Sequence, residues 1–461
     1  MSLPETIEIV PTRVPVGCKV SVPGSKSITN RALILAALGD GRTVLRGALW
    51  SEDTQIMVDA LRKLGFEVLV EPDPTQYSNR TITVTGLNGW VPLGGTPDAP
   101  LELFVGNAGT AARFLAAFVC LGKGVYKLVG TERMHQRPQK GLFNALRQLG
   151  YRVEPAPGDK LPALIYGGGP LATPTPCIVD ITESSQFASA LLLCANTGKW
   201  LVNVVGENPD ESPYVAMTKA MIERFPKLGG EFVIEPDSSS GSYFWAAGII
   251  THPEYINTWT SHSIEILAKH PEQVFPVVVE GWPFEFGWQI DSKFPMVLMR
   301  LFRPDIFGID PQKNLVTISR KSDLGDSIMT AVVVASFAQQ PTLFEDLGRL
   351  RLQECERVLA LRTELSKCGV VVVESGDTLQ IEPSLVHGAE IETYNDHRMA
   401  MCFSILGLRV ANMRIRNPNC VRKTFPDFYQ KLAAPPPLGL GVKILDGNTR
   451  SPIELDRLLA S

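Results

Sequence analysis

The sequence lacks the residue patterns that mark several large classes of protein. No two of its eight cysteines form a C-x-x-C pair, so neither zinc-site spacing nor a disulfide framework is visible. Apolar runs such as "AVVVASFA" (331–338) fall far short of the ~20 residues that a membrane span needs. The start, "MSLPETIEIVPT", has neither the basic nor the apolar region of a signal peptide. We therefore expect a cytoplasmic protein that acts away from membranes.

Positively and negatively charged residues are nearly balanced in number. The 44 Lys and Arg residues face 48 Asp and Glu residues, which gives a formal net charge of −4. This balance argues against a nucleic-acid coat or a membrane-surface role, although it is compatible with a local basic pocket. A chain of 461 residues is too long for one compact core, so two domains of similar size are expected.

Helix–glycine–strand units recur along the chain. The stretch "DTQIMVDALRKLGFEV" (53–68) predicts a helix that begins at an Asp53 cap and ends at Gly65 before a strand. Period-two alternation in "RTITVTGL" (80–87) and "KNLVTISR" (313–320) predicts strands. Because "KGLFNALRQLGYRVEP" and "RVLALRTELSKCGVVVVES" repeat the same order, we predict an α/β or α+β fold of repeated units.

Two regions depart from this order. Residues 252–312 are rich in Trp, Phe and Pro, as in "EGWPFEFGWQIDSKFPM", and are either an inserted subdomain or a remodelled unit. After Leu432, "AAPPPLGLGVKILDG" begins a tail rich in Pro and Gly, and the sequence leaves open whether this tail is ordered.

The stretch "VPGSKSITNRALILAALGDG" (22–41) is a Gly-Ser-Lys-Ser turn before an apolar helix. It is not a P-loop, because Ser25 rather than Gly precedes Lys26, and a P-loop kinase is thereby excluded. The N-terminus of a helix nevertheless favours an anion. Ser27 and Arg31 are i,i+4 neighbours, so they and Lys26 can converge on one anionic ligand. The alternative is a capped helix with surface cations.

Several further strings occur together with this stretch. They are "VPGSKSITNRALILAAL", "GNAGTAARFL", "GTERMHQRP", "SSQFASALLL", "YNDHRMAM" and "KTFPDF". In this order they resemble the 5-enolpyruvylshikimate-3-phosphate synthases of the enolpyruvyl (carboxyvinyl) transferase family. The resemblance extends from about residue 6 to 432, apart from roughly 250–312. The UDP-N-acetylglucosamine carboxyvinyltransferases share the fold, but "NDHRMAM" and "KTFPDF" fit the shikimate branch better.

The resemblance implies a fold, a reaction and its partners. Family members have two domains of three βαβαββ units each, in an inside-out barrel-like α/β (α+β) fold. One domain would be residues 24–235, and the other residues 1–23 with 236–461, including segment 252–312 and tail 433–461. The reaction moves the carboxyvinyl group of phosphoenolpyruvate to the 5-hydroxyl of shikimate 3-phosphate and releases phosphate without a metal or organic cofactor. These small molecules would be the partners of a monomer that binds no nucleic acid.

The resemblance also implies roles for the side chains at matching positions. Asp326 matches the base for the acceptor hydroxyl, Glu354 matches a proton-shuttling carboxylate, and Lys26 and His397 complete the catalytic set. Arg suits bidentate phosphate and carboxylate contacts, and Lys suits a point charge or a proton donor. The positions for phosphoenolpyruvate are Lys26, Asn107, Gly109, Arg133, Gln186, Arg357, Arg398 and Lys423.

Local structure is expected to position several of these residues. Glu354 and Arg357 are three residues apart, so we expect them on one face of a helix. Asn395-Asp396 is a good helix cap, which places His397 at a helix start. The structural alternatives are that Asp326 merely caps a helix, that Glu354 and Arg357 form a surface ion pair, and that His397 is a core histidine.

The family's acceptor pocket is only partly matched. Glu211 stands where a serine that contacts phosphate is usual, Gln353 replaces a substrate-binding lysine, and Arg349 replaces an asparagine. A carboxylate ~4 Å from a phosphate costs on the order of 4 kcal/mol at an effective dielectric constant near 20. Arg349, expected one helical turn from Gln353, would pair with Glu211 or bind the phosphate itself. The acceptor-binding set is Ser27, Arg31, Ser184, Ser185, Gln186, Tyr214, Asp326, Glu211, Arg349 and Gln353.

These departures leave three hypotheses. The acceptor is still shikimate 3-phosphate, with Arg349 supplying the lost charge; or the same donor is transferred to a different alcohol; or the chain is a non-catalytic homologue that binds similar ligands. The third is disfavoured because Lys26, Asp326, Glu354 and His397 are all present.

Overall fold

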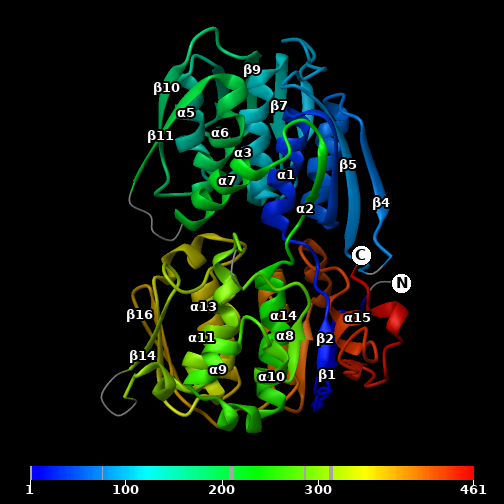
Figure 1. The fold of residues 1–461 in the computed structure, drawn as a ribbon, viewed down its shortest axis with the longest axis vertical. Helices are drawn as coiled ribbons and strands as arrows, with labels where there is room; N and C mark the ends of the chain where they lie inside the picture. Colours follow the sequence, from blue (N-terminus) through cyan, green and yellow to red (C-terminus); the bar gives the residue numbers. More distant parts are fainter. Residues whose placement is uncertain (1–2, 75, 207–211, 285–286, 311–314, 461) are drawn as a thin grey trace. The chain divides into compact units, whose positions relative to one another are not determined.

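The structure, a computed structural model, describes residues 3–74, 76–206, 212–284, 287–310 and 315–460. The chain forms two compact units (Figure 1). The central unit is Gly24–Glu235, and the terminal unit combines Met1–Pro23 with Pro236–Ser461. None of the helices in the described ranges is long and apolar enough to cross a membrane.

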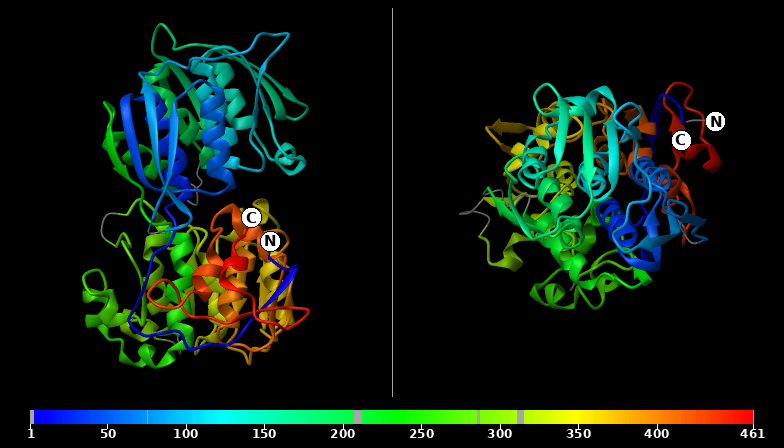
Figure 2. Two further views of the ribbon diagram at one scale, coloured as in Figure 1. Left: turned by 90° about the vertical axis from the view of Figure 1, so that its right-hand side faces the viewer. Right: turned by 90° about the horizontal axis from the view of Figure 1, so that it is seen from above.

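In the central unit, helices lie inside and sheets lie outside. Helices α1 (Lys26–Leu38), α3 (Gly109–Phe118) and α6 (Ser185–Gly198) pack on one another; α3 is buried at every position, and α1 and α6 are buried at most positions. A helix that is apolar on all sides is stable only in an interior. Strands such as β10 (Thr175–Asp180) alternate buried and exposed residues, so each sheet turns one face to solvent (Figure 2).

The predicted repeat of helices and strands is confirmed in both units. In the central unit a βαβαββ unit comprises β6 (Leu101–Phe104), α3, β7 (Lys123–Val129), α5 (Lys140–Gln148), β8 (Arg152–Ala156) and β9 (Lys160–Gly168). In the terminal unit its counterpart comprises β14 (Val316–Ser319), α12 (Ile328–Val334), β15 (Thr342–Glu345), α13 (Arg357–Lys367), β16 (Val372–Ser375) and β17 (Thr378–Ile381). The sheet orders, β6-β7-β9-β8 and β14-β15-β17-β16, correspond strand by strand.

Each unit has a second four-stranded sheet with one parallel and two antiparallel pairings. In the central unit it contains β12 (Gly230–Val233), β3 (Asp40–Leu49), β5 (Asn79–Leu87) and β4 (Val68–Pro72). In the terminal unit it contains β18 (Glu390–Ile391), β19 (Met413–Arg416), β1 (Thr6–Ile9) and β20 (Ile444–Asp446). A third sheet in each unit has, in the described part, two parallel strands: β10 with β11 (Trp200–Val205), and β13 (Val277–Val279) with β2 (Cys18–Val20).

The aromatic segment 252–312 is part of the core of the terminal unit. Trp245, on helix α8 (Ser238–Thr251), has its ring 5.0 Å from that of Phe275 and 5.5 Å from that of Trp282. The segment also supplies β13, which pairs with β2, and three helices: α9 (Ser261–Ile266), α10 (Pro271–Val274) and α11 (Phe294–Phe302). Because its aromatic rings cover α8, the segment is a remodelled unit and not a separate subdomain.

The C-terminal tail is ordered as well. Strand β20 pairs with β1, and Leu440, Val442 and Leu458 are buried in the same core. The tail therefore extends the sheet that contains the first strand of the chain.

Two local predictions are wrong. Helix α2 (Glu52–Lys63) is capped by Ser51, which forms a capping box with Thr54, so Asp53 lies inside the first turn. Glu354 does not lie on a helix with Arg357. The Glu356 side chain accepts a hydrogen bond from the Leu359 amide, and α13 consequently begins only at Arg357.

Arg349 and Gln353, which were expected one turn apart on a single helix, do not share a helix either. Arg349 lies in the 3-10 helix η6 (Leu347–Leu352), and Gln353 follows the end of that helix. The chain between η6 and α13 is irregular, which brings Gln353 and Glu354 close to the N-terminus of α13.

Candidate active site

Arg357 is the centre of a buried charge network in the terminal unit. Its side chain is 1% exposed, and Nε lies 2.7 Å from Oδ2 of Asp396. Nη2 lies 2.8 Å from Oε2 of Glu354, and Nη1 lies 3.8 Å from Oδ1 of Asp326. Burial alone would lower the pKa of Arg357, but the three carboxylates raise it. The guanidinium therefore stays charged and holds the three acids around it.

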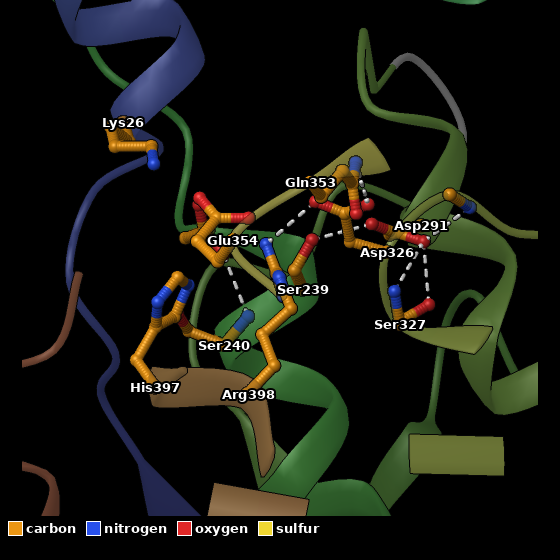
Figure 3. A network of polar contacts seen from close by, with 12 residues as sticks. Lys26, Ser239, Ser240, Asp291, Asp326, Ser327, Gln353, Glu354, His397 and Arg398 are labelled. Carbon is orange, nitrogen blue, oxygen red and sulfur yellow. Dashed lines mark hydrogen bonds and ion pairs between the residues drawn. The ribbon is translucent and has the colours of Figure 1, made fainter. Parts of the chain in front are cut away.

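Asp326 precedes helix α12 and contacts three arginines, of which Figure 3 labels Arg398. Its Oδ2 lies 3.1 Å from Nη2 of Arg398, and its Oδ1 lies 3.4 Å from Nη2 of Arg320. Gln353 also donates to Oδ1 from Nε2 at 3.3 Å. Burial alone would raise the pKa of Asp326, but Arg398, Arg357 and Arg320 together hold it well below its usual range.

Glu354 lies between two cations. Oε2 contacts Arg357, and Oε1 accepts a hydrogen bond from Nζ of Lys423 at 2.8 Å. Lys423 ends the 3-10 helix η7 (Pro418–Lys423), far from Glu354 in the sequence. The fold thus brings three of the predicted residues, Glu354, Arg357 and Lys423, into direct contact.

The predicted cap before His397 is confirmed. Asp396 is the N-cap of α14 (His397–Gly407), and its Oδ1 accepts a hydrogen bond from the Arg398 amide at 2.8 Å. His397 and Arg398 are both buried. The role of Asp396 as the carboxylate partner of Arg357 was not predicted, although its position beside His397 in "NDHR" was a signal for it.

The lowered pKa of Asp326 predicts how stability depends on pH. In the unfolded chain its pKa is about 3.9. A carboxylate whose pKa falls on folding stabilises the fold above the unfolded value, and this contribution is lost as the pH falls through the folded value. Urea unfolding of wild type and Asp326→Asn should differ by a constant amount between about pH 8 and about pH 5, and the difference should shrink below about pH 4. A difference that is unchanged at about pH 3 would contradict this expectation.

The start of α1 in the central unit carries a half-buried cation, Lys26, and a buried one, Arg31. Nζ of Lys26 lies 3.1 Å from Oδ2 of Asp53, whose side chain is 6% exposed. Arg31 is 2% exposed. It donates hydrogen bonds from Nε to Thr218 Oγ1 at 2.8 Å and from Nη2 to Ser189 Oγ at 3.0 Å. For Arg31, the alternative reading of α1 as a helix with surface cations is therefore wrong. Arg31 connects α1 to α6 and α7 (Ser212–Arg224).

The turn before α3 is packed against two arginines that the sequence analysis missed. Arg113 donates to the Gly109 carbonyl at 3.2 Å, and Arg137 donates to the Asn107 carbonyl at 3.3 Å. A Cβ atom on Gly109 would lie 2.7 Å from each guanidinium. Arg133, the predicted cation, is exposed and donates to Gln136 at 3.1 Å. The signal for Arg113 was its place one helical turn after Gly109.

The start of α6 collects the other predicted residues of the central unit. Ser184 caps α6 by accepting a hydrogen bond from the Gln186 amide at 3.3 Å, and both Ser184 and Ser185 are buried. Gln186 Nε2 donates to Thr110 Oγ1 at 3.5 Å, which joins α6 to α3. Tyr214 is half-buried in the first turn of α7.

Of the three residues that depart from the family's acceptor pocket, the structure describes two. Arg349 is half-buried in η6, and Gln353 is part of the Asp326 network. Glu211 lies outside the described residues, so its pairing with Arg349 stays a prediction.

The Lys26–Asp53 pair gives a prediction for the central unit. Asp53→Asn removes a buried carboxylate and leaves Lys26 with a weaker partner, and should lower the free energy of unfolding by about 1–3 kcal/mol. Asp59→Asn is the matched control, because Asp59 pairs with Arg62 on the exposed face of the same helix at 3.7 Å. The control should change stability by less than about 0.5 kcal/mol. Urea denaturation of both variants measures the two effects, and equal losses would contradict the assignment.

Comparisons with known proteins agree with the motifs and the geometry. A family model for EPSP synthase (3-phosphoshikimate 1-carboxyvinyltransferase) matches residues 10–227 and 305–432. The 3-phosphoshikimate 1-carboxyvinyltransferase of Aeromonas salmonicida (strain A449) is 35% identical over 444 residues, covering 90% of this chain and 96% of that protein. The enzyme of that name from Vibrio cholerae serotype O1 (strain M66-2) is 36% identical over 438 residues, with 90% and 96% covered.

Solved structures of low sequence identity show the same fold. EPSP synthase from Acinetobacter baumannii has a TM-score of 0.65 at 21% identity, and covers 95% of this chain and 99% of that chain. The enolpyruvyl transferase NikO from Streptomyces tendae has a TM-score of 0.61 at 15% identity, with 98% and 100% covered. Together with the family match and the curated relatives, these comparisons show that the chain belongs to the EPSP synthase (3-phosphoshikimate 1-carboxyvinyltransferase) family.

Proposed function

We propose that this protein transfers the carboxyvinyl group of phosphoenolpyruvate to the 5-hydroxyl of shikimate 3-phosphate and releases phosphate. The observation that carries the proposal is the contact network in which Arg357 holds Asp326, Glu354 and Asp396 at once. Curated relatives that carry the name 3-phosphoshikimate 1-carboxyvinyltransferase support the same reaction.

The reaction needs a base, an acid and fixed cations. The base removes the proton of the acceptor hydroxyl, and the acid protonates the methylene carbon of phosphoenolpyruvate. We assign the base to Asp326 and the acid to the Glu354–Lys423 pair, in which a proton on Nζ lies one hydrogen bond from the carboxylate. The acceptor oxygen bonds to the carbon that carries the phosphate and gives a tetrahedral adduct with a methyl group. Loss of phosphate, together with return of one methyl proton to the Glu354–Lys423 pair, then regenerates the carboxyvinyl group on the new oxygen.

Asp326 is a weak base while its arginines face it alone. Bound anionic substrates would offset the charges of Arg357 and Arg398 and so raise the pKa of Asp326. Asp326 would therefore stay ionised without substrates, and it would become an effective base only when they are bound.

The remaining predicted residues would bind the substrates. Phosphoenolpyruvate would contact Lys26, Asn107, Gly109, Arg133, Gln186, Arg357, Arg398 and Lys423. The acceptor would contact Ser27, Arg31, Ser184, Ser185, Gln186, Tyr214, Arg349 and Gln353, and His397 would complete the catalytic set. We further propose that the protein acts as a cytoplasmic monomer on these small molecules alone.

The experiment is a discontinuous assay on the purified protein. Phosphoenolpyruvate and shikimate 3-phosphate, without added metal, should yield stoichiometric phosphate and a product that is heavier than the acceptor by one carboxyvinyl group. Retained phosphoenolpyruvate binding without phosphate release would overturn this acceptor and favour another alcohol. Binding of both ligands without turnover would favour the non-catalytic homologue, and absence of both binding and turnover would overturn the proposed function.

Gln353 allows a direct test of the acceptor. It donates to Asp326 from Nε2 and accepts a hydrogen bond from Arg357 at Oε1, at the position where the family resemblance expects a lysine. Gln353→Lys adds a cation there and should lower the KM for shikimate 3-phosphate about 5-fold, while the KM for phosphoenolpyruvate stays within about twofold. Gln380→Lys is the control of equal net charge, because Gln380 lies on β17 and bonds to Glu382. An unchanged KM for the acceptor would contradict binding of a phosphorylated acceptor beside Gln353.

A further inference from the structure

A buried carboxylate that is not among the predicted site residues contacts the turn that carries Asp326. Asp291, in the 3-10 helix η3 (Ile290–Lys293), is 4% exposed. Its Oδ1 accepts hydrogen bonds from the amides of Gly325 at 2.6 Å and Ser327 at 3.2 Å, and from Ser327 Oγ at 2.5 Å. Its Oδ2 accepts one from Ser239 Oγ at 2.5 Å (Figure 3). Asp326 is the residue between the two amides that Asp291 holds.

These contacts fix the turn that carries Asp326 from two sides. Ser327 is the N-cap residue of α12, and Ser239 lies in the first turn of α8. Asp291 thus joins the N-termini of two packed helices through one side chain. Since four donors converge on its two oxygens, the carboxylate cannot rotate without breaking hydrogen bonds, and the Gly325–Ser327 turn is held with it.

The remodelled aromatic segment supplies this carboxylate. Asp291 lies in residues 228–304, which the family model does not match. Gln289, close by on the same segment, contacts the start of α8: Oε1 accepts from the Ser238 amide at 3.0 Å, and Nε2 donates to the Pro236 carbonyl, just before the helix, at 2.8 Å. Two buried polar side chains of one segment therefore support the start of α8, and Asp291 also reaches the turn of Asp326.

We propose that Asp291 is a positioning residue for the reaction: it fixes the Gly325–Ser327 turn so that the Asp326 carboxylate stays aimed between Arg398 and Arg357. The proposal rests on the function proposed above, because Asp326 acts there as the base. Asp291 itself touches no reacting atom and acts through Asp326 alone. The segment that looked like an insertion thus contributes to the geometry of catalysis.

The test compares Asp291→Ala with a conservative and a control variant. Asp291→Ala should lower kcat by about 10- to 100-fold, since a displacement of about 1 Å at a reacting group has effects of this size. Asp291→Asn keeps an oxygen for the two amides and an amide group for Ser239, and should restore kcat to within about 10-fold of wild type. Gln289→Ala, an equally buried change in the same segment, should reduce thermal stability but leave kcat within about 3-fold.

The decisive readouts separate positioning from general support of the fold. In an Asp326→Asn background, Asp291→Ala should have no further effect on kcat, because its only route to the reaction is already removed. Additive losses, or an equal loss of kcat in Gln289→Ala, would overturn the proposal. A crystal structure of Asp291→Ala, which needs no turnover, should show the Asp326–Arg398 contact lengthened from 3.1 Å. An unmoved Asp326 carboxylate would overturn the positioning role, whereas an inactive wild type with a displaced carboxylate in this variant would overturn only the proposed function.

Discussion

Arg357→Gln is expected to abolish measurable turnover and to lower the free energy of unfolding by about 3–5 kcal/mol. The cause is the set of carboxylates that the guanidinium holds: Asp396 has no exposed side-chain surface, and Asp326 and Glu354 are mostly buried. Removal of a buried cation leaves its partners charged and uncompensated, which costs more than the pair itself contributes. Chemical denaturation and steady-state kinetics of the same preparation measure both losses.

Arg351→Gln is the matched control for this experiment. Arg351 also contacts three carboxylates, Glu356, Glu374 and Asp377, at 2.7–3.0 Å, but its side chain is 26% exposed. Because solvent screens these pairs, the loss should be about 1 kcal/mol or less, with turnover retained. If both variants lost the same stability and activity, the special position of Arg357 would be refuted.

Glu354→Gln is expected to reduce kcat by about 10²- to 10⁴-fold, the range that general acid–base catalysis contributes. The amide keeps the shape of the side chain and can still accept from Lys423, but it cannot take up a proton. The KM for each substrate should change much less than kcat, because the cations proposed to bind the donor remain. Single-turnover measurements with both substrates separate the chemical step from binding.

Glu356→Gln tests whether the effect is specific to Glu354. Glu356 is two residues away, caps α13 through the Leu359 amide and pairs with Arg351. Its replacement should cost about 1 kcal/mol of stability, as the loss of a helix cap does, and leave kcat unchanged. Equal kinetic losses in the two variants would argue that Glu354 acts through the fold and not through its proton.

Much of this site could be predicted from the sequence because the motifs are local. Glycine turns before apolar helices gave the starts of α1 and α3, and Asn395-Asp396 gave the start of α14. Helix–glycine–strand units gave the repeated fold, because hydrophobic periodicity and turn residues act over short distances.

The contacts between distant segments could not be predicted in the same way. Spacing in "LQECER" suggested a helix, but the Glu356 side chain begins α13 later and leaves Glu354 in an irregular stretch. Arg113 and Arg137 meet Gly109 only after α3 and the following loop have packed. Composition marked residues 252–312 as rich in Trp, Phe and Pro, yet it carried no information that Trp245 is covered by Phe275 and Trp282.

The pairing of the site's cations has a consequence for selectivity. In the terminal unit, Arg398 and Lys423 each contact a carboxylate, and Arg357 contacts three. An entering anion must compete with these built-in acids, so a simple ion such as sulfate gains little by binding. Only a ligand with several suitably spaced negative groups can replace several of these carboxylates at once. Binding of common cellular anions to the site is therefore weak.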